Sequence, residues 1–404
     1  MEFLPDTVYM SSTLSNTRRN VGLLAACQAM LMSNNSTLIA INGLAGLALA
    51  PTPALATLPV TCWVAGGALS TLPASHYMKR VGRRAGLLQG MLFAFAGALL
   101  CAGAMWLGSF WTLCFGALVF GVFNAFGQYY RFVAADASPP DWRPTAISLV
   151  LAGGLVGGIL GPTVSRETVL LPGPRFAGAY LALTAYVAVM IALIALLRLP
   201  AAGAQEAGAR GRSLREIARQ PKFVVAVLSA AIGYGVMNFL MTSTPIAMLA
   251  CGHAYPDAAF VISSHVIGMF APSFFTGPLI KRVGVIPVLL AGATLNLVTI
   301  AIALAGVAVA NFWWALVILG VGWNFLYIGG TTLLTETYRP EERATAQGAN
   351  ETAIFVMMAI SSLSSGMIVT GSGWEKVNLS ALPLIACAMA VIVWFAFSRK
   401  GSRA

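Results

Sequence analysis

The chain has 404 residues, of which 58% are hydrophobic and only 9% are charged. Soluble domains average about 25% charged residues, so the composition excludes a soluble globular protein and predicts an integral membrane protein. The formal net charge is +11. The lysines and arginines collect in alternate short stretches between apolar segments, and this bias places basic loops on the cytoplasmic side of a membrane. The expected partner is therefore the lipid bilayer and not nucleic acid.

Apolar segments long enough to span a bilayer, which takes about 20 helical residues, occur along the whole chain. Twelve spans are predicted, at 20–41, 54–75, 86–106, 110–131, 144–165, 176–198, 222–250, 257–279, 285–308, 312–335, 344–369 and 380–398. The segment 201–221 is rich in alanine, glycine and arginine. We therefore expect an all-α integral membrane protein with two six-helix bundles, 1–200 and 222–404, a cytoplasmic linker between them, and both termini in the cytoplasm.

The two halves repeat each other in short patterns. Lys79–Gly82, with the sequence Lys-Arg-Val-Gly, returns unchanged as Lys281–Gly284, each time after the second span of its half. Pro140–Ala146 is echoed in the second half by Pro340–Ala346. The halves are therefore expected to be related copies of one six-helix unit.

Two such halves with a basic central loop resemble the major facilitator superfamily, whose halves are related by an axis along the membrane normal. Residues 79–84 look like the superfamily motif between spans two and three, G-x-L-A-D-R-x-G-R-R, and Gly277–Gly284 keeps more of it. Lys79 and Lys281 stand where the family usually has aspartate. The resemblance implies a twelve-helix transporter, and the usual loop ion pair that steadies the outward-open state is in question here.

Two soft-ligand patterns lie on neighbouring spans of the second half. Met237-x-x-x-Met241 and His265-x-x-x-Met269 each place two side chains on one helical face, one turn apart. In an antiparallel hairpin, Met241 would face the level of His265, and Met237 the level of Met269. Thioether sulfur selects Cu(I), so the four residues predict a copper site within the membrane. Packing is the alternative, since methionine is an ordinary filler of apolar helices.

The same two patterns resemble those of the CcoA-like copper importers, a bacterial branch of the superfamily in which both are attributed to copper binding. The resemblance implies that Met237, Met241, His265 and Met269 handle copper as a transported substrate, with no resident cofactor. It also implies import across the bacterial inner membrane by alternating access, which supplies cytochrome c oxidase assembly. A monomer is expected. Cys251 occupies the place of a family cysteine, and with Met248 it is a candidate relay on the outer path.

Amide and phenol groups in other spans favour a different cargo. They are Asn34, Asn35, Asn124, Gln128, Asn324 and Tyr327, which are expected to line a central cavity. Such groups suit an organic solute better than Cu(I), and relatives of the copper branch that lack the two motifs are associated with riboflavin uptake. The alternative is therefore a permease for riboflavin or another small organic solute.

Two further classes of protein fit the sequence less well than these importers. A copper sensor or assembly subunit would bind copper without flux, and the sequence offers no partner domain for it. An enzyme is not expected, because no nucleotide-binding loop and no nucleophile–base pair is visible. The run of glycines from Gly153 to Gly161, followed by Pro162, resembles an antiporter motif in scrambled order, which leaves the direction of flux open.

Overall fold

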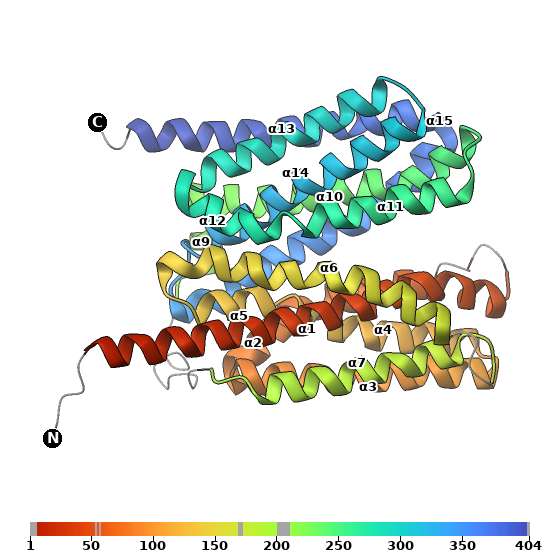
Figure 1. Ribbon diagram of the computed structural model, residues 1–404, viewed down its shortest axis with the longest axis horizontal. Helices are drawn as coiled ribbons and strands as arrows, with labels where there is room; N and C mark the ends of the chain where they lie inside the picture. The colour runs from red at the N-terminus through yellow and green to blue at the C-terminus, as the bar shows by residue number, and fades with distance from the viewer. Residues whose placement is uncertain (1–5, 53–54, 56–57, 169–172, 200–210, 402–404) are drawn as a thin grey trace. The chain divides into compact units, whose positions relative to one another are not determined.

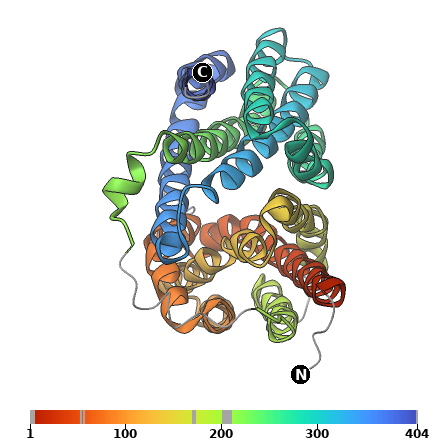
Figure 2. The same cartoon turned by 90° about the vertical axis from the view of Figure 1, so that its left-hand side faces the viewer.

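The computed structural model describes residues 6–52, 55, 58–168, 173–199 and 211–401. These residues form helices and turns, with no strand among them. The chain divides into two compact units, Met1–Ala209 and Arg210–Ala404, here called unit 1 and unit 2. Within each unit the helices run side by side in Figure 1, and Figure 2 shows most of them end on. The predicted all-α fold class is confirmed.

Unit 1 is built around α1 and α4. The first of these packs mainly against α6, and the second packs against both α2 and α3. Its elements are α1 (Asp6–Leu49), α2 (Leu58–Val81), α3 (Arg83–Leu107), α4 (Phe110–Gly127), α5 (Tyr130–Asp136), the 3-10 turn η2 (Pro140–Trp142), α6 (Arg143–Thr168) and α7 (Ala177–Ala195).

Unit 2 is built around α14, which packs against α10, α11 and α13, while α10 also packs against α15. Its elements are α9 (Leu214–Ala218), α10 (Pro221–Ala250), α11 (Tyr255–Phe270), α12 (Ser273–Val283), α13 (Val285–Leu304), α14 (Val309–Leu334), the 3-10 turn η3 (Pro340–Glu342) and α15 (Arg343–Gly401). Gly373 is non-helical, with φ 78°, and divides α15 into two parts that carry the last two predicted spans.

Ten helical stretches among the described residues are long and apolar enough to cross a membrane. The first of them is α3, and together they coincide with the last ten of the twelve predicted spans. Helices α1 and α2 coincide with the first two predicted spans but lie outside these ten. Polar residues in the middle of α1, among them Gln28, Asn34 and Asn35, lower its hydropathy.

Two predicted spans are broken. The span 110–131 consists of α4 and the short α5, and the span 257–279 consists of α11 and α12, separated by Ala271 and Pro272. Proline has no backbone N–H, so it removes a helical hydrogen bond and interrupts a helix. The second break lies directly after one of the soft-ligand patterns.

The sequence repeat is also a structural repeat. Gly82 and Gly284 end the Lys-Arg-Val-Gly patterns with φ values of 89° and 88°, a left-handed conformation that glycine adopts without a steric penalty. The turns η2 and η3 likewise begin at the equivalent prolines and lead into α6 and α15. The two units therefore use the same turns at the same places.

An ion pair closes the turn between α2 and α3 although the motif lacks its aspartate. Arg83 lies 3.2 Å from the carboxylate of Asp136 at the end of α5. Both side chains are 14% exposed. Lys79, which replaces the usual aspartate, is half-buried. Within unit 1, the turn is thus joined to α5 through the second arginine of the motif.

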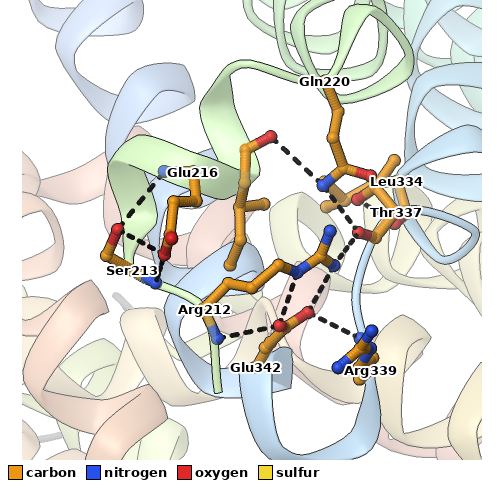
Figure 3. A network of polar contacts seen from close by, with 9 residues as sticks. Arg212, Ser213, Glu216, Gln220, Leu334, Thr337, Arg339 and Glu342 are labelled. Carbon is orange, nitrogen blue, oxygen red and sulfur yellow. Dashed lines mark hydrogen bonds and ion pairs between the residues drawn. The ribbon is translucent and has the colours of Figure 1, made fainter.

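Within unit 2, a polar network joins the described end of the predicted linker to the turn that follows α14 (Figure 3). The Nε and Nη2 atoms of Arg212 donate to the Oε1 and Oε2 atoms of Glu342, at 2.7 and 2.6 Å. The backbone N–H of Arg212 donates to the same carboxylate. Arg212 and Gln220 both donate to the backbone oxygen of Thr337. In the next turn, the backbone N–H and hydroxyl of Ser213 lower the pKa of the Glu216 carboxyl below its usual range.

Candidate transport site

His265 lies on α11 with none of its surface exposed. Its ring Nδ1 is 2.6 Å from the backbone oxygen of Leu316 on α14. A carbonyl oxygen can only accept, so Nδ1 donates, and in the neutral ring Nε2 keeps a free lone pair. Nε2 is buried and has no hydrogen-bond partner among the described residues. Metal-binding histidines are arranged in this way, with one ring N–H bound to a carbonyl and the other nitrogen open.

Contacts with α14 fix the depth of α11. Gly320 packs against the backbone of His265, Gly268 and Met269 so closely that no Cβ would fit. Together with the bond from His265 to Leu316, these contacts show that α11 and α14 run in the same direction. His265 lies at the level of Leu316, and Met269 lies one turn further along, at the level of Gly320.

Contacts with α14 fix the depth of α10 as well. Gly330 packs against Ala226 and Ala230 of α10, and Gly233 of α10 packs against Leu326. The two helices therefore run antiparallel. Four and eight residues beyond Gly233, Met237 comes to the level of Gly322 and Met241 to the level of Ile318.

The two soft-ligand patterns thus come to similar depths along α14. Met241 is offset from His265, and Met237 from Met269, by two residues of α14, which is about 3 Å along the helix axis. Met237 and Met269 are buried, and Met241 is half-buried. The hairpin expectation differs from the structure in one respect, because α11 packs far more against α14 than against α10. The assignment of the four residues to one ligand set stays a prediction.

The two residues of the predicted outer relay differ in exposure. Met248 is completely buried on α10, whereas Cys251 is exposed at the C-terminal end of that helix. Each lies further along α10 than the methionine pattern. Their role as a relay stays a prediction.

An aromatic cluster of unit 2 lies on the same three helices. Tyr234 of α10 meets Trp323 and Tyr327 of α14 edge to face, with ring centroids 5.5 and 5.4 Å apart. Trp323 and Tyr327 are stacked at 4.9 Å, and Phe270 of α11 meets Trp323 at 5.6 Å. The indole Nε1 of Trp323 is buried without a hydrogen-bond partner among the described residues. Tyr234 alone is half-buried, so it forms the accessible edge of the cluster.

Asn324 has a structural task rather than the cavity-lining role expected from its position. Its Nδ2 donates to the backbone oxygen of Met269 at 2.7 Å and to the hydroxyl of Ser273 at 2.6 Å, and its Oδ1 accepts from Thr276. Carbonyls in the last turn of a helix lack helical partners, and Met269 is in the last turn of α11. Asn324 therefore spans the break between α11 and α12 with both ends of its amide.

The equivalent asparagine of unit 1 is bonded differently. Asn124 accepts through Oδ1 from Asn35 at 3.1 Å and from Gln128 at 3.4 Å. Asn34 donates to the backbone oxygen of Met30. The Oδ1 atoms of Asn34 and Asn35 are buried with no hydrogen-bond partner in the described part of the chain. Unit 1 thus holds two amide oxygens that can still accept a hydrogen bond.

Sequence reasoning missed the aromatic cluster apart from Tyr327. Aromatic residues in spans are usually packing residues or anchors at the membrane surface, and the sequence gives no sign that Tyr234, Phe270 and Trp323 meet. The available signal is weak. Trp323 and Tyr327 are four positions apart, so they share one face of α14, next to Asn324.

Comparisons with known proteins agree with this architecture. The model of the Major Facilitator Superfamily matches residues 23–263 and 226–404. The riboflavin transporter RfnT of Brucella anthropi is 39% identical over 381 residues, which cover 93% of this chain and 95% of that protein. The uncharacterized transporter YdeG of Bacillus subtilis is 30% identical over 85% of this chain and 84% of its own length.

A solved structure shares the fold at low identity. The major facilitator superfamily transporter FucP, in its outward conformation, superposes with a TM-score of 0.76 over 94% of this chain and 98% of that one, at 17% identity. With the family match and the two relatives, the chain is a multi-pass membrane transporter and not an enzyme. The chain belongs to the major facilitator superfamily.

Proposed function

We propose that this protein transports riboflavin or a closely related flavin across the membrane. The observation that carries the proposal is the 39% identity with the Brucella anthropi riboflavin transporter over nearly the full length of both chains. This identity supports riboflavin, the alternative cargo suggested by the sequence, and does not support copper. The basic residues collect in every second loop, and therefore on one side of the spans, which favours an orientation with both termini in the cytoplasm.

The aromatic cluster of unit 2 supports a flavin on chemical grounds. The isoalloxazine ring is planar, and aromatic side chains bind planar rings through their faces, with each aromatic pair contributing about 0.5–1.5 kcal/mol beyond area burial. Tyr234 is half-buried and forms the accessible edge of the cluster, and the Trp323 Nε1 is a buried donor with no acceptor among the described residues. A carbonyl on the pyrimidine edge of the flavin would supply that acceptor.

The test is uptake of tritiated riboflavin into bacterial cells that cannot make riboflavin and lack their own flavin permease. Cells that express this protein should accumulate label and grow on low riboflavin, whereas cells with an empty vector should not. Equal accumulation in both, with the protein present in the membrane, would overturn the proposal.

Cu(I) is a second candidate cargo, and the geometry of His265 favours it. A buried imidazole, whose Nε2 has no partner among the described residues, lies within one helical turn of the depth of Met241, and Met237 and Met269 lie about one turn further along. Neutral thioether and imidazole ligands suit Cu(I) and would leave the ion its positive charge. Inward movement of that charge is favoured by about 2.3 kcal/mol per 100 mV of membrane potential.

One experiment separates the two cargoes. Radioactive copper and tritiated riboflavin are offered to the same cells, with the wild-type protein and with a Met241→Ala, His265→Ala double variant present at equal abundance. A copper importer loses copper uptake in the variant. A flavin permease accumulates riboflavin and shows no copper uptake above the empty vector. Copper binding by the purified protein without uptake would instead indicate a sensor or an assembly subunit.

A further inference from the structure

Unit 1 contains a cavity whose lining residues include none of the asparagines described above. Its volume is about 290 Å³, and α2, α3 and α4 each contribute to its wall. The residues that matter below are Ser70, Ala74 and Tyr77 of α2, Gln89 and Phe93 of α3, and Phe126 of α4. On each helix the residues that line the cavity are three or four positions apart, so they form stripes along one face.

The cavity is a groove with α4 as its floor. Helices α2 and α3 each pack tightly against α4 and only slightly against each other. Gly66 of α2 touches Gly121 of α4 with no room for a side chain, and the groove begins about one turn further along α2. Helices α2 and α4 are thus in close contact at Gly66 and Gly121. Beyond these glycines the side chains are larger, and a gap remains between α2 and α3.

The groove opens onto the surface of unit 1 between apolar side chains. Tyr77 and Phe93 are 38% and 37% exposed at its rim. On the same helices, Leu69 is 74% and Leu92 is 60% exposed. Large apolar side chains that are exposed on the membrane-spanning helices of a transporter face lipid chains, since water would disfavour them. The surroundings of the groove are therefore hydrocarbon.

A positive charge lies at one end of this groove. Arg80 follows Tyr77 by three positions, so it continues the same stripe of α2 by one turn, and it is exposed. Of the other two arginines in the turn, Arg83 pairs with Asp136, and Arg84 donates to the backbone oxygen of Ala195. Arg80 is thus the guanidinium that continues the groove.

We propose that the groove between α2 and α3 binds one acyl chain of an anionic phospholipid, whose phosphate pairs with Arg80. The apolar stripes match the chain, and the guanidinium matches the phosphate, since arginine forms paired hydrogen bonds with phosphate oxygens. A headgroup with net negative charge fits better than a zwitterionic one, because Lys79 adds a second positive charge to this end of α2 and a zwitterionic headgroup brings its own cation. This site is separate from the transported solute.

The test is native mass spectrometry of the full-length protein with phosphatidylglycerol or phosphatidylcholine added in detergent. Three variants are compared with the wild type. Arg80→Gln removes the charge, Ser70→Phe fills the groove, and Arg282→Gln removes the equivalent charge from the repeated turn of unit 2. Riboflavin or copper uptake by the same variants, measured in cells, checks that each is folded.

The wild type should retain phosphatidylglycerol in preference to phosphatidylcholine. Arg80→Gln should weaken phosphatidylglycerol retention about fivefold, the value of one basic residue near a lipid surface, and weaken phosphatidylcholine retention less, because the choline cation already offsets the charge of its phosphate. Ser70→Phe should weaken both lipids, and Arg282→Gln neither. Equal losses in Arg80→Gln and Arg282→Gln would mean general attraction of anionic lipid to basic turns and would overturn the proposal, as would retention that none of the variants changes.

Discussion

The ring Nδ1 of His265 donates a hydrogen bond to the backbone oxygen of Leu316, 2.6 Å away on a different helix. This bond fixes the tautomer of the ring and its rotation about the side chain. It also ties α11 to α14 within two residues of the depth that Met241 reaches from α10. The orientation of a single buried ring is therefore set by the packing of unit 2 and not by its own helix.

A substitution at His265 can separate its structural role from a role as a ligand. Asparagine places an amide N–H near the position of Nδ1, so His265→Asn should keep the bond to Leu316 and unfold at nearly the wild-type temperature. His265→Ala should lose about 1 kcal/mol, the usual net value of one hydrogen bond. Thermal unfolding in detergent measures both effects. If Cu(I) binds at this site, both variants should lose it, and wild-type Cu(I) affinity in His265→Asn would exclude Nε2 as a ligand.

Trp323 offers a test of flavin binding that leaves the aromatic cluster in place. Trp323→Phe keeps a ring between Tyr327 and Phe270 but removes the indole N–H. We expect the riboflavin concentration for half-maximal uptake to rise about five- to tenfold, the value of one hydrogen bond of about 1–1.5 kcal/mol, with little change in maximal rate. Trp314→Phe is the matched control, because Trp314 is on the same helix and is 52% exposed. An identical shift in both variants would contradict a specific role for Trp323.

The bridge made by Asn324 predicts a large loss of stability from a small change. Asn324→Asp keeps the shape and the acceptor for Thr276 but removes the donor to the backbone oxygen of Met269 and places a carboxyl among buried groups. Leaving such groups without partners costs about 1–3 kcal/mol each, so the melting temperature in detergent should fall clearly. Asn311→Asp, a half-buried position near the start of the same helix, should have a much smaller effect.

Two ion pairs of unit 2, Arg212–Glu342 and Lys222–Glu336, should differ in strength. Arg212 grips Glu342 through two nitrogens, and the glutamate side chain is completely buried, whereas Lys222 and Glu336 meet through one nitrogen and are 31% and 47% exposed. Double-mutant cycles with glutamine, read from chemical denaturation, should give about 1.5–3 kcal/mol of coupling for the first pair. The second should give less than about 1 kcal/mol, as exposed pairs do. Equal couplings would show that the paired geometry adds nothing.

The helices of unit 2 follow closely from the sequence. The predicted spans 222–250 and 312–335 differ from α10 and α14 by a few residues at most, because a continuous apolar run both forms the helix and sets its length. The depths of the two soft-ligand patterns along α14 come within two residues of the predicted match. Spacing along two antiparallel helices sets them to that extent once the turn between the helices is short, and the assignment of the four residues to one ligand set stays a prediction.

The contacts of individual side chains could not be predicted in the same way. His265 binds a backbone oxygen, and every residue has one, so no sequence signal marks Leu316 as its partner. Asn324 was expected to line a cavity because it is polar and within a span. Its actual task arises from the break between α11 and α12, which places Met269 in the last turn of α11, where carbonyls lack helical donors, and this depends on where α14 packs.

The same bridge has a consequence for how the protein is made. Within a membrane, no water can satisfy the oxygen of Met269, and an unsatisfied backbone group there costs several kcal/mol. Helix α11 is synthesised before α14. The oxygen of Met269 at the end of α11 therefore lacks the Asn324 donor until α14 has been made. The second unit is therefore expected to mature in the bilayer only after its fourth span has arrived, and chains truncated before Asn324 should be degraded rather than accumulate.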